Sequence, residues 1–106
     1  MLNDDVADLA LGLMLSIARR IPQADKFVRN SDWVEGPFPL QNKMSGARLG
    51  LVGIGRIGQA IAKRAAAFDM SIAYTSRHEV HTLPFTYYPS AKDLAAQVDY
   101  LSLIHI

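Results

Sequence analysis

The order of apolar and polar residues predicts two helices followed by alternating strands and helices. Residues 1–20 (MLNDDVADLALGLMLSIARR) are mostly apolar, with acidic residues near the start and arginines at the end. This charge order suits the dipole of a helix, and Asn3 is placed to cap it. A shorter helix with charges on one side is expected over residues 22–34. Residues 35–46 are rich in proline and glycine and predict a loop.

The first predicted helix has almost no polar face. Its apolar positions are Val6, Leu9, Leu11, Leu13, Met14, Leu15 and Ile17. A helix that is apolar nearly all round must be covered on most sides, and the rest of this chain predicts few elements to cover it. We therefore infer that this helix packs against another domain or another subunit.

From Arg48 onward, strands and helices alternate. Short apolar runs predict strands over residues 47–54, 71–76 and 99–104, with a further short strand around 85–88. Helices are expected over residues 57–70, with Lys63 and Arg64 on the solvent side, and over residues 90–98, with Ser90 as N-cap. This alternation predicts an α/β fold in which helices flank a parallel sheet.

The amino-acid composition limits which binding partners and which cellular compartment the chain is expected to have. The chain has 106 residues, enough for one domain, and its net charge of +1 gives no argument for nucleic acid or an anionic membrane. It has no cysteine, which excludes disulfides and thiolate metal sites and fits a cytoplasmic location. The N-terminal stretch starts with acidic charges, unlike a signal peptide, and polar residues interrupt it too often for a membrane span.

The segment GIGRIG, residues 53–58, stands between a predicted strand and a predicted helix. That is the context which the dinucleotide-binding fingerprint requires. Gly53 would allow the tight turn, Gly55 the approach of a pyrophosphate, and Gly58 the close packing of helix on strand. The N–H groups of Arg56 and Ile57 would lie at the helix N-terminus, which attracts anions, and we expect Arg56 to contact phosphate. The alternative is a glycine-rich turn with no ligand.

The end of the second strand, YTSR, predicts which nicotinamide cofactor is preferred. Proteins that choose NAD usually carry an acidic residue there, whereas this chain has Ser76 followed by Arg77. Ser76 can donate a hydrogen bond to a 2′-phosphate and Arg77 can pair with it, a charge-assisted contact worth roughly 1.5–3 kcal/mol. We therefore expect NADPH to be preferred about ten- to hundredfold, with NAD still possible. The alternative is that Arg77 is only a solvated loop residue.

Three stretches together resemble the D-isomer-specific 2-hydroxyacid dehydrogenases, most of all the NADP-preferring glyoxylate and hydroxypyruvate reductases. They are LNDDVADLALGLMLSIARRIPQAD, LGLVGIGRIGQAIAKRAAAFDMSIAYTSR and YYPSAKDLAAQVDYLSL. The resemblance implies that residues 1–106 are a partial, truncated Rossmann-type NAD(P)-binding domain. The helices of residues 1–35 would lead into a nucleotide-binding core of residues 46–104, and the substrate domain would be absent.

The resemblance also implies an activity that this chain cannot complete alone. In the family, hydride passes between the cofactor and C2 of a 2-keto acid, which yields a D-2-hydroxy acid. The family's catalytic His, its substrate-binding Arg and its orienting Glu lie C-terminal to the matched region. His78, His81 and His105 do not match that His, so we expect no catalytic residue here, and no metal. Relatives of this kind are usually homodimers, with contacts that involve the N-terminal helix.

The ends of the chain suggest a fragment. Met1 need not be a native start, and Ile104, His105 and Ile106 depart from the family pattern and resemble a cloning scar. We expect cofactor binding at best, and no turnover by the chain alone. Two alternatives stay open: a non-catalytic dinucleotide-binding sensor or corepressor-like module, and a truncated product with no stable fold.

Overall fold

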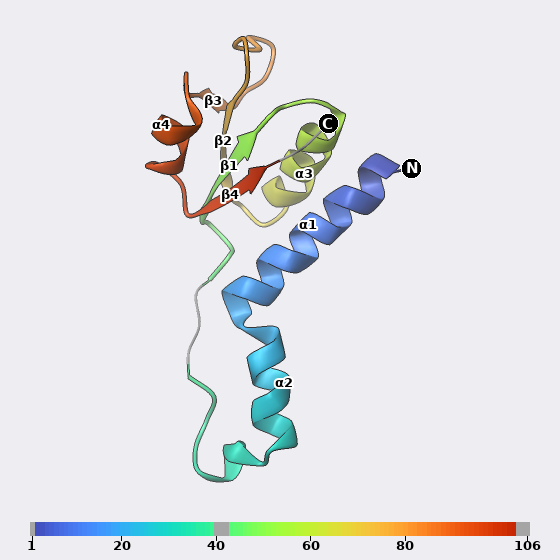
Figure 1. The fold of residues 1–106 in the computed structure, drawn as a ribbon, viewed down its shortest axis with the longest axis vertical. Coiled ribbons are helices and arrows are strands. Elements are labelled where there is room, and N and C mark those ends of the chain that lie inside the picture. The colour runs from blue at the N-terminus through green and yellow to red at the C-terminus, as the bar shows by residue number, and fades with distance from the viewer. Residues whose placement is uncertain (1, 40–42, 104–106) are drawn as a thin grey trace.

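A parallel sheet forms the centre of the chain (Figure 1). The computed structural model describes residues 2–39 and 43–103. In it, strands β1 (Arg48–Val52), β2 (Ser71–Thr75), β3 (Thr86–Tyr87) and β4 (Tyr100–Leu103) lie in the order β3-β2-β1-β4, and every pair is parallel. Helices α3 (Arg56–Ala66) and α4 (Ala91–Ala95) connect strands. This is the α/β, Rossmann-type arrangement that the alternation predicted.

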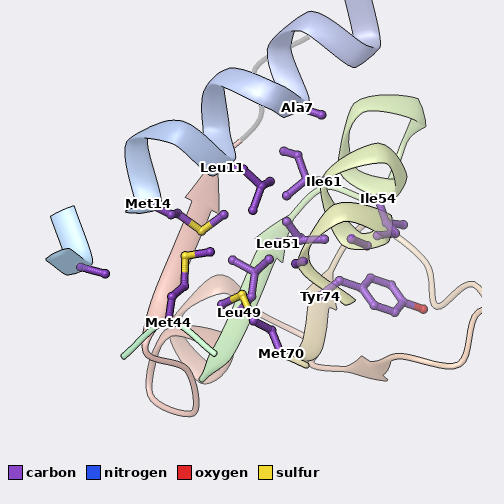
Figure 2. Packing of buried hydrophobic residues seen from close by; sticks show 13 residues of the cluster. Ala7, Leu11, Met14, Met44, Leu49, Leu51, Ile54, Ile61, Met70 and Tyr74 are labelled. Atoms are coloured by element: carbon purple, nitrogen blue, oxygen red, sulfur yellow. The ribbon is translucent and has the colours of Figure 1, made fainter. Parts of the chain in front are cut away.

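Successive residues of β1 point to opposite faces of the sheet, as in any pleated strand. Leu49 and Leu51 are completely buried in the core that Figure 2 shows, on the side of α3. Gly50 faces α4, and a Cβ there would lie only 3.0 Å from the Leu94 and Val98 side chains. The absence of a side chain at this position therefore lets α4 lie directly on the strand.

The long N-terminal helix α1 (Leu2–Arg19) packs along α3. Ala7, Leu11, Met14 and Ala18 form its buried face, and Leu11 points toward Ile61 of α3 in Figure 2. Arg64 of α3 reaches across to α1: its Nε donates to Asp8 at 2.6 Å and its Nη2 to Asp4 at 3.3 Å. The prediction that Arg64 lies on the solvent side of its helix is therefore wrong, because these ion pairs draw it into the contact between helices.

One further detail of α1 differs from expectation. Asn3 is not the N-cap, since the helix already includes Leu2. As expected, the described residues cover only one face of this helix: Leu9, Leu13 and Ile17, each four residues from the next, are 61%, 55% and 70% exposed. Within residues 2–39 and 43–103, no helix combines the length and the apolar character that crossing a bilayer requires.

Helix α2 (Ile21–Arg29) and the short helix η1 (Asp32–Val34) form an arm that extends away from the sheet (Figure 1). Neither element contains a buried residue. An edge-to-face contact between Phe27 and Phe38, with ring centroids 5.2 Å apart, joins α2 to the segment that follows η1. The arm makes the radius of gyration 16.0 Å, against about 13 Å for a compact domain of this length.

Candidate functional site

The turn after β1 has the geometry that the glycines predicted. Gly53 has a φ of 102°, a conformation that L-residues rarely adopt, and its N–H donates to the Thr75 carbonyl at 2.9 Å. Gly55 is exposed and caps α3 in an extended conformation. The Gln59 side chain donates to the Ile54 carbonyl at 3.0 Å and braces the turn from inside the helix. The chain thus reverses from strand to helix in three residues, Gly53 to Gly55.

The N-terminus of α3 is open to an anion. No side chain caps this helix, so the first N–H groups, those of Arg56, Ile57 and Gly58, lack an intrahelical acceptor. Gly58 is buried, whereas Arg56 is exposed beside the turn. Unpaired N–H groups and the positive end of the helix dipole are what a phosphate group binds. A pyrophosphate therefore fits this end of α3.

The register of the sheet brings the two predicted halves of the site together. Val52, the last residue of β1, pairs with Thr75, the last residue of β2. Gly53 and Ser76 therefore follow neighbouring strands at the same carboxyl edge, where parallel sheets of this class bind their ligands. The hydrogen bond from Gly53 to the Thr75 carbonyl connects the two turns directly.

Ser76 and Arg77 begin the loop that follows β2. The Ser76 hydroxyl donates to the His78 carbonyl at 2.6 Å, a hydrogen bond within the loop. To donate to a phosphate instead, the hydroxyl would have to rotate away from that carbonyl. Arg77 is exposed, and its guanidinium makes no hydrogen bond or ion pair within the part of the chain that the structure describes. A cation in that state is available to an anionic ligand.

Two tyrosines that the sequence did not point to also support this loop. The Tyr74 hydroxyl accepts a hydrogen bond from Val80 N at 2.7 Å and lies 3.3 Å from the Val80 carbonyl, to which it donates. The Tyr87 hydroxyl donates to the Ser76 carbonyl at 3.2 Å. Apolar periodicity marks both residues as strand positions, but a hydroxyl partner six or eleven residues away leaves no trace in the pattern.

The two histidines that the structure describes do not form a site. His78 and His81 are exposed, and His81 has only Glu79 nearby, 3.7 Å from its ring. His105 lies outside the described residues, as do Ile104 and Ile106. Among residues 2–39 and 43–103, no group of three or more His, Asp or Glu side chains could hold a metal ion.

Comparison with known proteins decides the family. Residues 11–105 match the domain described as D-isomer specific 2-hydroxyacid dehydrogenase, NAD binding domain. The chain belongs to this family. The match covers the fingerprint turn, the loop after β2 and all four strands.

Named members of the family are similar over nearly the whole chain. Hydroxyphenylpyruvate reductase of Plectranthus scutellarioides is 51% identical over 100 residues, which are 94% of this chain and 32% of that protein. A glyoxylate/hydroxypyruvate reductase of Arabidopsis thaliana is 48% identical over the same shares. The chain therefore spans about a third of the length of the curated relatives that it matches.

Solved structures of family members have the same fold. The crystal structure of the NADPH-dependent glyoxylate/hydroxypyruvate reductase of Sinorhizobium meliloti, in complex with NADP and malonate, superimposes with a TM-score of 0.89. It is 46% identical and covers 97% of this chain, which matches 33% of that one. A 2-hydroxyacid dehydrogenase of Ketogulonicigenium vulgare reaches a TM-score of 0.92 at 38% identity, over 96% of this chain and 33% of that one.

Proposed function

We propose that this chain is the cofactor-binding part of an NADPH-preferring reductase that converts a 2-keto acid of the glyoxylate or hydroxypyruvate type into a D-2-hydroxy acid. The observation that carries the proposal is the meeting of two features at one edge of the sheet. The open N-terminus of α3, within residues 53–58, lies beside a loop that starts with Ser76 and Arg77. No carboxylate occupies those two loop positions.

Each residue of the site has a binding or orienting role. The backbone of Gly55, Arg56 and Ile57 would hold the pyrophosphate, and buried Gly58 keeps α3 close to the sheet. Ser76 and Arg77 would bind the 2′-phosphate. The bound nicotinamide supplies the hydride, and the residues that handle the substrate and its proton lie outside this chain. Turnover is therefore not expected from the chain alone.

The relatives support the choice of substrate and cofactor. Two of them are named as reductases of glyoxylate and hydroxypyruvate, and the one from Sinorhizobium meliloti is described as NADPH-dependent. The exposed row of Leu9, Leu13 and Ile17 on α1 supports a further part of the proposal, a homodimer formed through this helix. A row of that kind on a surface helix is typical of a contact between proteins.

A paired titration tests the cofactor site. The purified chain is titrated with NADPH and with NADH at one fixed salt concentration, since phosphate contacts depend on salt. We expect NADPH to bind about ten- to hundredfold more tightly. Arg77→Ala should abolish most of that difference by weakening NADPH binding, because NADH has no 2′-phosphate for Arg77 to pair with.

Arg29→Ala is the matched control. It removes the same side chain from α2, in the arm that extends away from the sheet (Figure 1). Arg29 pairs with Asp25, and its side chain is 77% exposed. This variant should keep the NADPH preference. Equal affinities of the wild-type chain for the two cofactors, or a preference that survives Arg77→Ala, would contradict the proposal. Oxidation of NADPH by the chain with glyoxylate, above a protein-free control, would contradict the placement of the catalytic residues outside it.

A further inference from the structure

We propose that Tyr87, together with Tyr74, is a positioning residue for cofactor choice: the two hydroxyls hold the loop of residues 76–80 so that Arg77 is ready to meet the 2′-phosphate of NADPH. This inference rests on the proposed function, because it assigns to Arg77 the role argued there. It adds residues that do not touch the cofactor in that scheme and that act through the backbone of the loop.

The two hydroxyls are carried by well-packed positions. Tyr74 lies in β2 and pairs in register with Tyr87 of β3. Their rings lie side by side, with centroids 5.4 Å apart, and the Tyr74 residue is completely buried. Tyr87 is partly buried and packs against the fully buried Tyr74 ring. Because this packing limits the alternative rotamers of both rings, their hydroxyls are fixed points for the loop.

These hydroxyls hold both ends of the loop. Tyr87 donates to the carbonyl of Ser76, the first loop residue, at 3.2 Å. Tyr74 receives the N–H of Val80 at 2.7 Å and returns its own proton to the Val80 carbonyl. Between them, the Ser76 side chain closes a short turn onto the His78 carbonyl at 2.6 Å. Arg77 therefore extends from backbone that is held before and after it.

Held backbone should raise affinity for NADPH in particular. A guanidinium on a mobile loop loses backbone and side-chain freedom when it binds a phosphate, and a loop that is already ordered avoids part of that loss. NADH presents no 2′-phosphate, so its affinity does not depend on the position of Arg77. The tyrosine hydroxyls are thus expected to affect the ratio of the two affinities rather than cofactor binding in general.

Tyr87→Phe tests this inference with minimal disturbance, since it keeps the ring and removes only the donor to Ser76. We expect NADPH affinity to fall about two- to tenfold, the effect of one hydrogen bond, and NADH affinity to stay the same. Hydrogen exchange of the backbone amides of residues 76–80, measured without cofactor, should become faster. Tyr88→Phe is the control, because its hydroxyl, one residue away, makes no hydrogen bond among the described residues; it should change neither quantity.

A double-mutant cycle with Arg77→Ala shows whether the tyrosine acts through the arginine. Tyr87→Phe should lower NADPH affinity no further once Arg77 is gone. Unchanged exchange in Tyr87→Phe, an NADPH preference that persists in it, or additive losses in the cycle would each overturn this inference alone. A wild-type chain without NADPH preference would overturn the proposed function and this inference with it.

Discussion

At the scale of single residues, Gly53 is the position where the backbone freedom of glycine matters most. Its φ of 102° is the backbone conformation that turns the chain from β1 toward α3. In Gly53→Ala the new methyl group would meet no other atom within 4 Å, but alanine rarely adopts this φ. The loss of stability therefore comes from the backbone conformation alone. We expect a loss of about 1–3 kcal/mol in the free energy of unfolding, and weaker binding of both cofactors, measured by denaturant unfolding and by titration.

Gly12→Ala is the counterpart of that experiment. Gly12 lies inside α1, is exposed, and a Cβ there would also meet nothing within 4 Å. In a helix interior, alanine is favoured over glycine by roughly 0.5–1 kcal/mol. The same substitution should therefore stabilise the chain at position 12 and destabilise it at position 53. Equal changes in the free energy of unfolding for the two variants would contradict the claim that the turn at Gly53 requires glycine.

At the scale of elements, an ion pair joins the starts of two strands. The Arg48 guanidinium, at the start of β1, donates from Nη2 to Asp99 Oδ1 at 3.1 Å and from Nε to Oδ2 at 3.2 Å, just before β4. The Arg48 backbone N–H adds a bond to Asp99 Oδ2 at 2.8 Å. These hydrogen bonds with Arg48 lower the pKa of the Asp99 carboxyl below its ordinary value of 3.8.

This shift predicts how stability depends on pH. A carboxyl whose pKa is lower in the folded chain stabilises the fold above its unfolded value and loses that contribution as pH falls through the folded value. We expect Asp99→Asn to be less stable than wild type at pH 7, with the difference shrinking below about pH 4. Thermal unfolding across pH 2–7 measures this. Asp69→Asn, on an exposed turn with φ of 58° that asparagine tolerates, should leave the profile unchanged.

At the scale of the whole molecule, the chain leaves an apolar groove open between α1, α3 and the edge strand β4. Val6, Leu9, Leu13, Ile57, Leu101 and Leu103 are among the residues that line it. Parallel sheets normally have both faces covered, and Leu103 at this edge is 66% exposed. The row of Leu9, Leu13 and Ile17 borders the same groove, which gives the proposed homodimer a surface to bury.

Leu13→Glu tests that surface. A charge in the centre of an apolar contact has no partner there, so we expect self-association to weaken about tenfold or more. Sedimentation equilibrium over a range of protein concentrations measures it. Ala95→Glu places the same charge on exposed α4, on the opposite face of the sheet, and should leave association as it is. A wild-type chain that stays monomeric at every concentration would contradict the dimer through α1.

Much of the fold and of the cofactor turn could be predicted from the sequence, because the signals are local. Strands, helices and the cap of Ser90 on α4 follow from the periodicity and placement of neighbouring residues, and the structure confirms the Ser90 cap at 3.1 Å from Asp93 N. The positive φ at Gly53 follows in the same way from a glycine between a strand and a helix. Dinucleotide binding itself is anticipated by the spacing of three glycines.

The remaining features depend on which residues meet across the fold, and local pattern does not contain that information. Arg64 is drawn to Asp4 and Asp8 because α1 lies along α3, a contact between residues more than fifty positions apart. Gly50 is required because α4 crosses β1 at that residue. The support of the Ser76 loop by Tyr87 arises only when β3 pairs with β2. The sequence by itself determined the elements and the class of ligand; the packing of those elements decided what holds the binding loop in place.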